Sequence, residues 1–327
     1  MRAKFVNCEE KTKACRWKTR LGHWRRALAG ILLCFALSVA ARSEPKRPHI
    51  LGIRTVEIRV SNQATANQFY SRLNRVLGEC SRCGEQSLPY SLLLPSLQRV
   101  VVWTGYSERP STFVNSVGFE IDDVRAMEKF LHAKKVAFDL VLPVDGDAYL
   151  NVIDPEGHLI QFIEPSNQDR VFVEGLLHQV KKEASVRLIH TGFVVKDRAA
   201  MDKFYKDVLG FHVYWHGGMK NGETDWVDMQ VPDGTDWIEY MLNAGPNPDK
   251  HTLGVLNHIA LGVPDVRAAA NQLEKNGVQL PEQPKIGRDG KWQLNLYDPD
   301  GTRVELMEFT PAEKPCCSEY TGPHPKP

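Results

Sequence analysis

Two histidines and two glutamates are spaced in matching pairs in the second half of the chain. His190 and His258 are 68 residues apart, and Glu239 and Glu305 are 66 residues apart. A single residue of either type on a half-exposed strand is usually just solvated, so the argument depends on all four in register. Two imidazoles and two carboxylates that converge on one sheet face are costly unless a cation pairs with them. We therefore predict that these four side chains bind one divalent metal ion.

The elements that must position these residues form one unit used twice. The first unit reads as a strand, an amphipathic helix closed by a glycine, and three further strands: 188–195, 199–209, 212–216, 225–231 and 237–242. The second unit repeats this order: 258–263, 266–276, near 285, 292–297 and 303–308. Each histidine then lies on the first strand of its unit and each glutamate on the last. Because side chains alternate along a strand, each glutamate points away from its apolar neighbours, which pack against the helices.

Short motifs of the second half also occur in the first half. The pairs are Asp123–Ala126 with Asp265–Ala268, Asp154–Gly157 with Asp298–Gly301, and Phe69-Tyr70 with Phe204-Tyr205. We therefore predict two domains, 50–167 and 186–311. A linker helix in 168–185 joins them, and a proline-rich extended tail, 312–327, follows.

The tandem strand, helix and three-strand pattern resembles the vicinal oxygen chelate superfamily. The motifs that carry the resemblance are the run His258-Ile-Ala-Leu-Gly-Val-Pro-Asp265 and the run Asp298-Pro-Asp-Gly-Thr-Arg-Val-Glu305. This superfamily includes glyoxalase I, fosfomycin and bleomycin resistance proteins and extradiol dioxygenases. The resemblance covers 186–311 clearly and 50–167 more faintly. It implies an α+β fold with cupped, mostly antiparallel sheets and a divalent metal bound in the cup.

The first domain lacks the predicted ligands at the corresponding positions. Superposing the shared motifs puts Thr55 and Ser116 in the places of the two histidines. The same superposition puts Trp103-Thr104 near the place of Glu239, and Gln161 in the place of Glu305. We therefore predict that the first domain is a metal-free partner that buries a face of the second domain or shapes its mouth.

The ligand set favours one reaction type over two alternatives. Two histidines with two glutamates resemble glyoxalase I, in which the metal stabilises an enediolate and a loosely held carboxylate moves the proton next to the carbonyl. On that resemblance Glu239 or Glu305 is the general base, and the metal is Ni, Zn, Mn, Co or Fe. The protein is then a metal-dependent lyase, isomerase or epimerase that acts on a small carbonyl compound.

An extradiol dioxygenase with Fe(II) is the first alternative, since His190, His258 and Glu305 supply its two-histidine, one-carboxylate set. Those enzymes also carry a histidine and a tyrosine before the final turn. Here Asn295 stands in the place of the tyrosine, and the stretch 285–292 holds no histidine. The second alternative is a binding module, similar to bleomycin-sequestering proteins, that traps a small molecule without converting it.

Two further residues are candidate substrate contacts in the cup. Arg288 lies in a glycine-flanked loop, where a guanidinium near the metal would orient an anionic substrate, and Asn295 lies on the next strand. Four units in one chain are enough to build a complete cup, so a monomer suffices.

The first 41 residues have the composition of a secretory signal peptide. Nine basic residues precede thirteen apolar or small residues, 27–39, and two alanines follow. We expect cleavage and export to the periplasm or the exterior, with an uncleaved membrane anchor as the alternative. Without this segment the net charge falls from +1 to −6, because the segment carries nine cations and two anions. A net charge of −6 argues against a nucleic-acid partner.

Cleavage and export would determine which cysteines remain and whether they can form disulfides. The mature chain would keep four of the seven: Cys80, Cys83, Cys316 and Cys317. In an oxidising compartment Cys80 and Cys83 could form a local disulfide, or either could pair with a cysteine of the tail.

Overall fold

The computed structural model describes residues 44–77, 90–94, 98–104, 113–144, 146–166 and 186–327. The predicted signal peptide, the predicted linker helix and the Cys80, Cys83 pair lie outside these ranges. Among the described residues, no helix combines the length and the apolar character needed to cross a bilayer.

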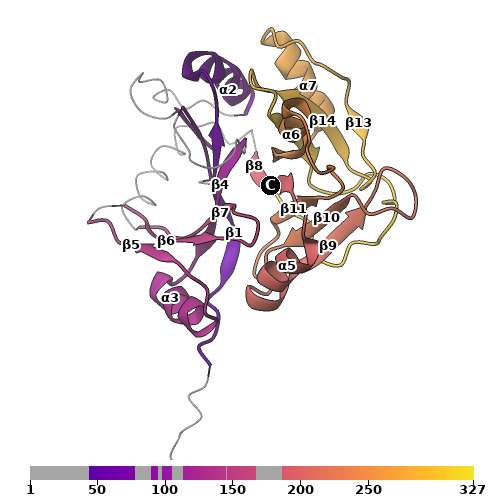
Figure 1. Ribbon diagram of the computed structural model, residues 1–327. Helices are drawn as coiled ribbons and strands as arrows, with labels where there is room; N and C mark the ends of the chain where they lie inside the picture. Colours follow the sequence, from indigo (N-terminus) through magenta and orange to yellow (C-terminus); the bar gives the residue numbers. More distant parts are fainter. Residues whose placement is uncertain (1–43, 78–89, 95–97, 105–112, 145, 167–185) are drawn as a thin grey trace, which may run out of the picture. The chain divides into compact units, whose positions relative to one another are not determined.

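The first domain is built on a seven-stranded sheet with two described helices (Figure 1). Its strands are β1 (Ile50–Arg59), β2 (Tyr90–Leu93), β3 (Arg99–Trp103), β4 (Val114–Ile121), β5 (Asp139–Val141), β6 (Ala148–Ile153) and β7 (Leu159–Glu164). The strand order is β2-β3-β1-β4-β7-β6-β5. The helices are α2 (Gln63–Leu77) and α3 (Val124–Ala133).

The second domain is built on an eight-stranded sheet. Its strands are β8 (Arg187–Val194), β9 (His212–Gly217), β10 (Trp226–Gln230), β11 (Trp237–Met241), β12 (His258–Val263), β13 (Lys285–Ile286), β14 (Trp292–Tyr297) and β15 (Arg303–Glu308). The strand order is β13-β14-β15-β12-β8-β11-β10-β9. Only the pairs β8·β11 and β12·β15 are parallel in this sheet. The predicted α+β class with mostly antiparallel sheets is therefore confirmed.

The helices of the second domain begin at aspartates that cap them. They are α5 (Arg198–Asp202), which continues as the π-helix η1 (Lys203–Val208), α6 (Lys250–Leu256) and α7 (Val266–Lys275). The side chain of Asp265 accepts hydrogen bonds from the backbone N–H groups of Arg267 and Ala268, and that of Asp123 accepts one from Ala126 at the start of α3. The shared motif Asp-Val-Arg-Ala is therefore a helix start. The sequence analysis placed no helix where α6 lies.

Two tyrosines join the domains reciprocally. Tyr70 on α2 donates a hydrogen bond to Asp298 in the last turn of the second domain, at 3.1 Å. Tyr205 on η1 donates one to Asp154 in the corresponding turn of the first domain, also at 3.1 Å. All four side chains are buried. The two shared motifs of the sequence therefore contact each other across the domain boundary.

The tail forms no helix or strand, yet hydrogen bonds hold it against the second domain. Thr321 N–H donates to the carbonyl of Tyr214 at 3.0 Å, and Tyr320 O–H donates to the carbonyl of Asp289 at 2.7 Å. Cys316 and Cys317 form a disulfide with each other. The expectation that Cys80 or Cys83 pairs with the tail is therefore wrong. The pairing of these adjacent cysteines is accompanied by a left-handed backbone at Cys317, with a φ of 72°.

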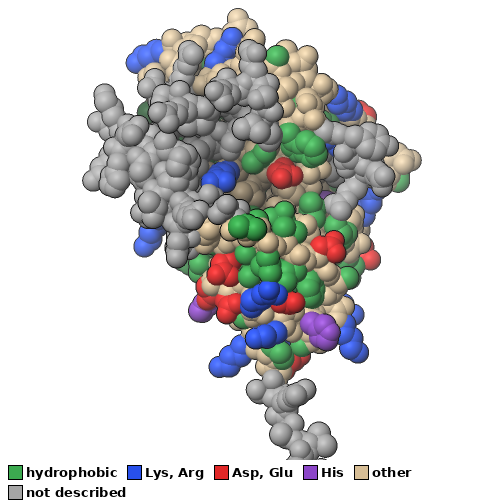
Figure 2. Space-filling view, turned by 90° about the vertical axis from the view of Figure 1, so that its left-hand side faces the viewer, with side chains coloured by type: hydrophobic (Ala, Val, Ile, Leu, Met, Phe, Trp, Pro, Cys, Tyr) green, Lys and Arg blue, Asp and Glu red, His purple; other side chains and the backbone are tan. Residues whose placement is uncertain are grey.

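The surface of the first domain is mixed in character. Acidic and basic side chains are interspersed with hydrophobic ones on the face drawn in Figure 2. The described side chains on that face therefore carry charges of both signs, unlike the single-signed charge typical of a nucleic-acid surface.

Candidate metal centre

The two histidines meet at the centre of the second sheet. His190 lies on β8 and pairs with Ala260, whereas His258 begins β12 and pairs with Gly192. Their Nε2 atoms are 3.1 Å apart. The glycine is required at position 192, because a Cβ there would lie 2.0 Å from the His258 ring.

The two glutamates come from strands on either side of this pair. Glu305 on β15 stands beside Ala260, and its Oε2 lies 3.7 Å from Nε2 of His190 and 3.8 Å from that of His258. Glu239 on β11 stands beside Gly192, and its Oε2 lies 2.9 Å from Nε2 of His258. The structure thus brings together all four side chains that the spacing singled out.

The donor set fits a divalent cation. Ligand atoms of His190, His258 and Glu305 all lie within 4.8 Å of one another, and the three residues are buried. Nδ1 of His258 is 3.0 Å from the carbonyl of Leu256, which fixes the proton on Nδ1 and leaves Nε2 as an electron-pair donor. The ring of His190 stacks on Trp237 with 4.7 Å between ring centres. Imidazole and carboxylate donors suit Zn, Ni, Co, Mn or Fe(II), so the set does not select one metal.

Burial keeps both imidazoles neutral. Burial, and then the neighbouring His258 and Arg303, lower the pKa of His190. Burial and Arg303 also lower the pKa of His258, although the neighbouring carboxylate of Glu239 opposes the shift. A neutral imidazole is the form that binds a metal, so the environment favours binding.

The two carboxylates sit in unlike environments. Burial raises the pKa of Glu305 to about 8. Burial also acts to raise the pKa of Glu239, but the neighbouring His258 and Arg303 outweigh it, and the pKa is lowered. Glu239 is therefore the more acidic of the two and the one that stays ionised.

Arg303 belongs to the centre, and the sequence analysis did not single it out. Its Nη2 lies 2.7 Å from Nε2 of His258, 3.8 Å from Glu239 and 3.9 Å from Glu305. The signal was available, because a residue two positions before Glu305 on a strand shares its face.

A second group of charges lies next to the centre, around Trp237. Lys291 is fully buried, with its Nζ 4.6 Å from the ring centre of Trp237 and 5.4 Å from those of Tyr214 and Tyr320. Burial lowers the pKa of Lys291, whereas it raises the pKa of the neighbouring Asp289 to about 6. Cation–π contacts with three rings compensate part of the cost of burying this amine.

A cavity of about 350 Å³ opens onto the centre. Its walls include His190, Glu239, Glu305, Trp215, Trp226, Met219, Arg288, Asn295 and Arg303. The two predicted substrate contacts therefore line it, but each already bonds to protein groups. Arg288 donates to the carbonyl of Gly218 and to Asn221, and the amide of Asn295 donates to Glu282 at 2.7 Å.

Strand pairing locates the corresponding positions of the first domain. On β1, Thr55 stands opposite Gly118 as His190 stands opposite Ala260, and Ser116 takes the place of His258. Gln161 takes the place of Glu305. Val101 takes the place of Glu239, because Val101 on β3 pairs with Glu57 on β1 just as Glu239 on β11 pairs with Gly192 on β8. The sequence analysis put Trp103-Thr104 there because it carried one offset past segments of unequal length.

Comparisons with known proteins agree with this geometry. Residues 187–306 match the family profile described as Glyoxalase/Bleomycin resistance protein/Dioxygenase superfamily. A probable lactoylglutathione lyase of Synechocystis is 27% identical over 123 residues, which are 37% of this chain and 94% of that protein. The lactoylglutathione lyase of Haemophilus influenzae is 26% identical over 125 residues, or 38% of this chain and 93% of that protein.

Solved structures resemble a larger part of the chain. Homoprotocatechuate 2,3-dioxygenase of Arthrobacter globiformis aligns with a TM-score of 0.58 and 20% identity, covering 83% of each chain. The substrate complex of the Brevibacterium fuscum enzyme aligns with a TM-score of 0.57 and 19% identity, covering 86% of this chain and 88% of that one. At such identity the likeness concerns the fold.

Proposed function

We propose that the protein is a glyoxalase-type enzyme, because residues 187–306 match the profile of the superfamily of glyoxalases, bleomycin resistance proteins and dioxygenases. It would be a metal-dependent lyase, isomerase or epimerase that moves a proton next to the carbonyl group of a small molecule. The observation that carries this proposal is the second carboxylate. His190, His258 and Glu305 alone make up a two-histidine, one-carboxylate set, and Glu239 adds a base beside them.

In this scheme each side chain has a distinct role. His190, His258 and Glu305 would hold a divalent ion, which would supply a Lewis acid for the carbonyl oxygen. Glu239, whose pKa is lowered, accepts the proton from the carbon next to the carbonyl. Glu239 then returns that proton to the neighbouring carbon, so an isomer of equal composition leaves.

The cavity supports a small substrate with an apolar part and an anionic group. Its volume of about 350 Å³ is at the lower end of the range for ligand pockets. Trp215 and Trp226 supply apolar wall, and Arg303 supplies positive charge next to the centre. Glutathione is a poor candidate if the protein is exported, since little glutathione is present outside the cytosol.

An Fe(II) extradiol dioxygenase is the second candidate, and the two-domain fold shared with homoprotocatechuate 2,3-dioxygenases favours it. The residue types that line the cavity argue against a dioxygenase. Among the described residues that line the cavity, His190 is the only histidine and tyrosine is absent. A ring-cleaving enzyme of that kind would lack its usual acid and base partners here.

Solvent deuterium exchange tests the proposal. The protein, loaded in turn with Ni²⁺, Co²⁺, Mn²⁺ and Zn²⁺, is incubated in D₂O with a panel of small hydroxyketones and 2-oxoaldehyde hemithioacetals. Nuclear magnetic resonance then follows deuterium at the carbon next to the carbonyl. We expect exchange with at least one compound, and a loss of about 100-fold or more in Glu239→Gln.

Ser116→Ala is the matched control, because Ser116 occupies the place of a ligand in the first domain. It should exchange at the wild-type rate. Oxygen uptake with Fe(II) and catechols, without deuterium exchange, would overturn the proposal in favour of the dioxygenase. Tight binding of panel compounds without exchange or oxygen uptake would favour the binding module.

We also propose that the chain is exported after cleavage near residue 41, on the composition of its first 41 residues. Intact mass and N-terminal sequencing of the protein from its native cells test this. A mature chain that still begins at Met1 would reject cleavage.

A further inference from the structure

The C-terminal tail connects the two opposite edges of the second sheet beside the cavity. β9 and β13 are the outermost strands of that sheet. Cys316 N–H donates to the carbonyl of Arg288 at 2.8 Å, in the loop that follows β13. The carbonyl of Cys316 accepts a hydrogen bond from Trp215 Nε1 at 3.2 Å, on β9. One residue of the tail thus bonds to both edges, and both of its partners line the cavity.

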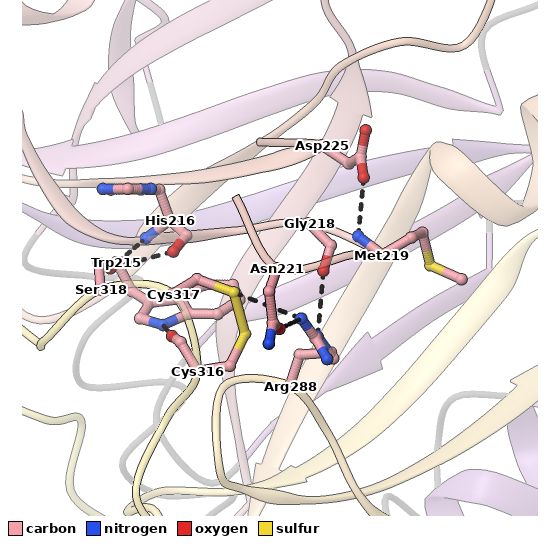
Figure 3. Close-up of a disulfide and its surroundings, with 10 residues drawn as sticks. All are labelled: Trp215, His216, Gly218, Met219, Asn221, Asp225, Arg288, Cys316, Cys317 and Ser318. Carbon is pink, nitrogen blue, oxygen red and sulfur yellow. Dashed lines mark hydrogen bonds between the residues drawn. A yellow bond between two sulfur atoms is a disulfide. The ribbon is translucent and has the colours of Figure 1, made fainter. Parts of the chain in front are cut away.

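Arg288 makes a second connection between the same edges. Its Nε donates to the carbonyl of Gly218 at 3.1 Å, and its Nη2 donates to Asn221 at 2.6 Å. The same Nη2 lies 3.6 Å from Sγ of Cys317 (Figure 3). The loop after β13, the turn after β9 and the tail therefore meet at this guanidinium.

The disulfide between Cys316 and Cys317 lies at this junction. Cys317 is exposed, so its sulfur is open to a reagent in solution. Its backbone has a φ of 72°, a left-handed conformation that residues other than glycine rarely adopt. The covalent link to Cys316 holds this conformation in place, and with it the hydrogen bonds of Cys316 to Arg288 and Trp215.

We propose that the Cys316–Cys317 disulfide is a redox-modification site through which a small dithiol opens the wall of the cavity. A thiolate of the dithiol attacks Sγ of Cys317, the S–S bond breaks, and Cys316 leaves as a thiol after taking up a proton. The second thiol of the reagent then closes its own disulfide and releases Cys317. Two electrons pass to the protein, two protein thiols form, and the dithiol becomes a cyclic disulfide.

Reduction has two structural consequences. Cys317 is free to leave the left-handed conformation, which loosens the hydrogen bonds of Cys316 to Arg288 and Trp215. A guanidinium also stabilises a neighbouring thiolate. Arg288 is therefore drawn toward the reduced Cys317 and away from Gly218 and Asn221. Both consequences separate the two edges of the sheet and widen the cavity.

Hydrogen exchange with mass spectrometry tests the proposal on the full chain, with dithiothreitol as the probe. Reduction should speed exchange in 213–217, 287–291 and 312–321 by up to about tenfold, the change expected when single hydrogen bonds weaken. Exchange in β1 (50–59), which lies in the other domain, should not change. Peptide mapping of the aerobic protein should show Cys316 linked to Cys317.

Two variants separate this effect from others. Cys316→Ser with Cys317→Ser should show the faster exchange without dithiothreitol and no further response to it, which also excludes metal removal by the reagent. Cys80→Ser with Cys83→Ser should respond as the wild type does. Free Cys316 and Cys317 thiols in the aerobic protein, or equal exchange before and after reduction, would overturn the proposal. These readouts do not depend on the reaction proposed above, so either proposal can fail alone.

Discussion

Removing the hydroxyl group of Tyr70 and removing that of Tyr205 should lower the free energy of unfolding by unequal amounts. Tyr70→Phe and Tyr205→Phe each delete a hydrogen bond of 3.1 Å to a buried aspartate of the other domain. The two aspartates differ in the hydrogen-bond partners that Oδ2 keeps after the substitution. Oδ2 of Asp154 keeps a contact of 2.8 Å with Nδ1 of His158, whereas Oδ2 of Asp298 has Tyr70 as its only hydrogen-bond partner among the described residues.

The magnitudes follow from this difference. A hydrogen bond to a charged group contributes about 1.5–3 kcal/mol, and a buried acceptor left without a partner loses the full value. We therefore expect Tyr70→Phe to reduce the free energy of unfolding by about 2–3 kcal/mol. Tyr205→Phe should cost about 1–1.5 kcal/mol, because His158 continues to satisfy Asp154. The double variant should show the sum of the two costs, since the sites share no partner.

Urea denaturation followed by tryptophan fluorescence and circular dichroism measures these costs. Tyr297→Phe serves as the control, because Tyr297 is 39% exposed and its loss should cost less than about 0.5 kcal/mol. A larger cost for Tyr205→Phe than for Tyr70→Phe would refute the reasoning about the remaining partner. Costs below about 0.5 kcal/mol for both would refute the importance of the contacts themselves.

Three further outcomes are expected at the metal centre. Gly192→Ala should abolish metal binding in a folded protein, because the added Cβ displaces the His258 ring; elemental analysis and circular dichroism check this. His190→Ala with His258→Ala should likewise lose the metal, whereas Ser116→Ala should retain about one ion per chain. Metal affinity should fall about tenfold per pH unit as the pH decreases below about 8, because a protonated Glu305 must lose its proton before it can bind the ion. Competition with a chelator between pH 6 and 8 measures this affinity. An affinity that does not change with pH would contradict the prediction.

The features predicted from the sequence are those whose cause is local. Asp123 and Asp265 begin helices because each side chain bonds to backbone groups within three residues of itself. The four candidate ligands could be singled out because two equivalent strands in each unit place equivalent positions on one face. Spacing alone carries that information.

The features that were missed depend on partners distant in sequence. Tyr70 and Tyr205 were noticed as parts of a repeat, but their bonds to the opposite domain exist only once the domains pack. Lys291 is buried partly by Tyr320, which belongs to a tail without any periodicity. Its burial therefore could not be inferred from the residues around it.

The docked tail also bears on how copies of this chain behave in solution. An edge strand with free backbone groups is a template on which another chain can form a sheet. In this protein the tail forms hydrogen bonds with the free edge of β9. Ser318 bonds to both the N–H and the carbonyl of His216, and Thr321 bonds to the carbonyls of Tyr214 and Val213. The prolines at 323, 325 and 327 lack the N–H groups that would extend the ladder. The last sixteen residues thus hinder another chain from pairing with this edge of the second sheet.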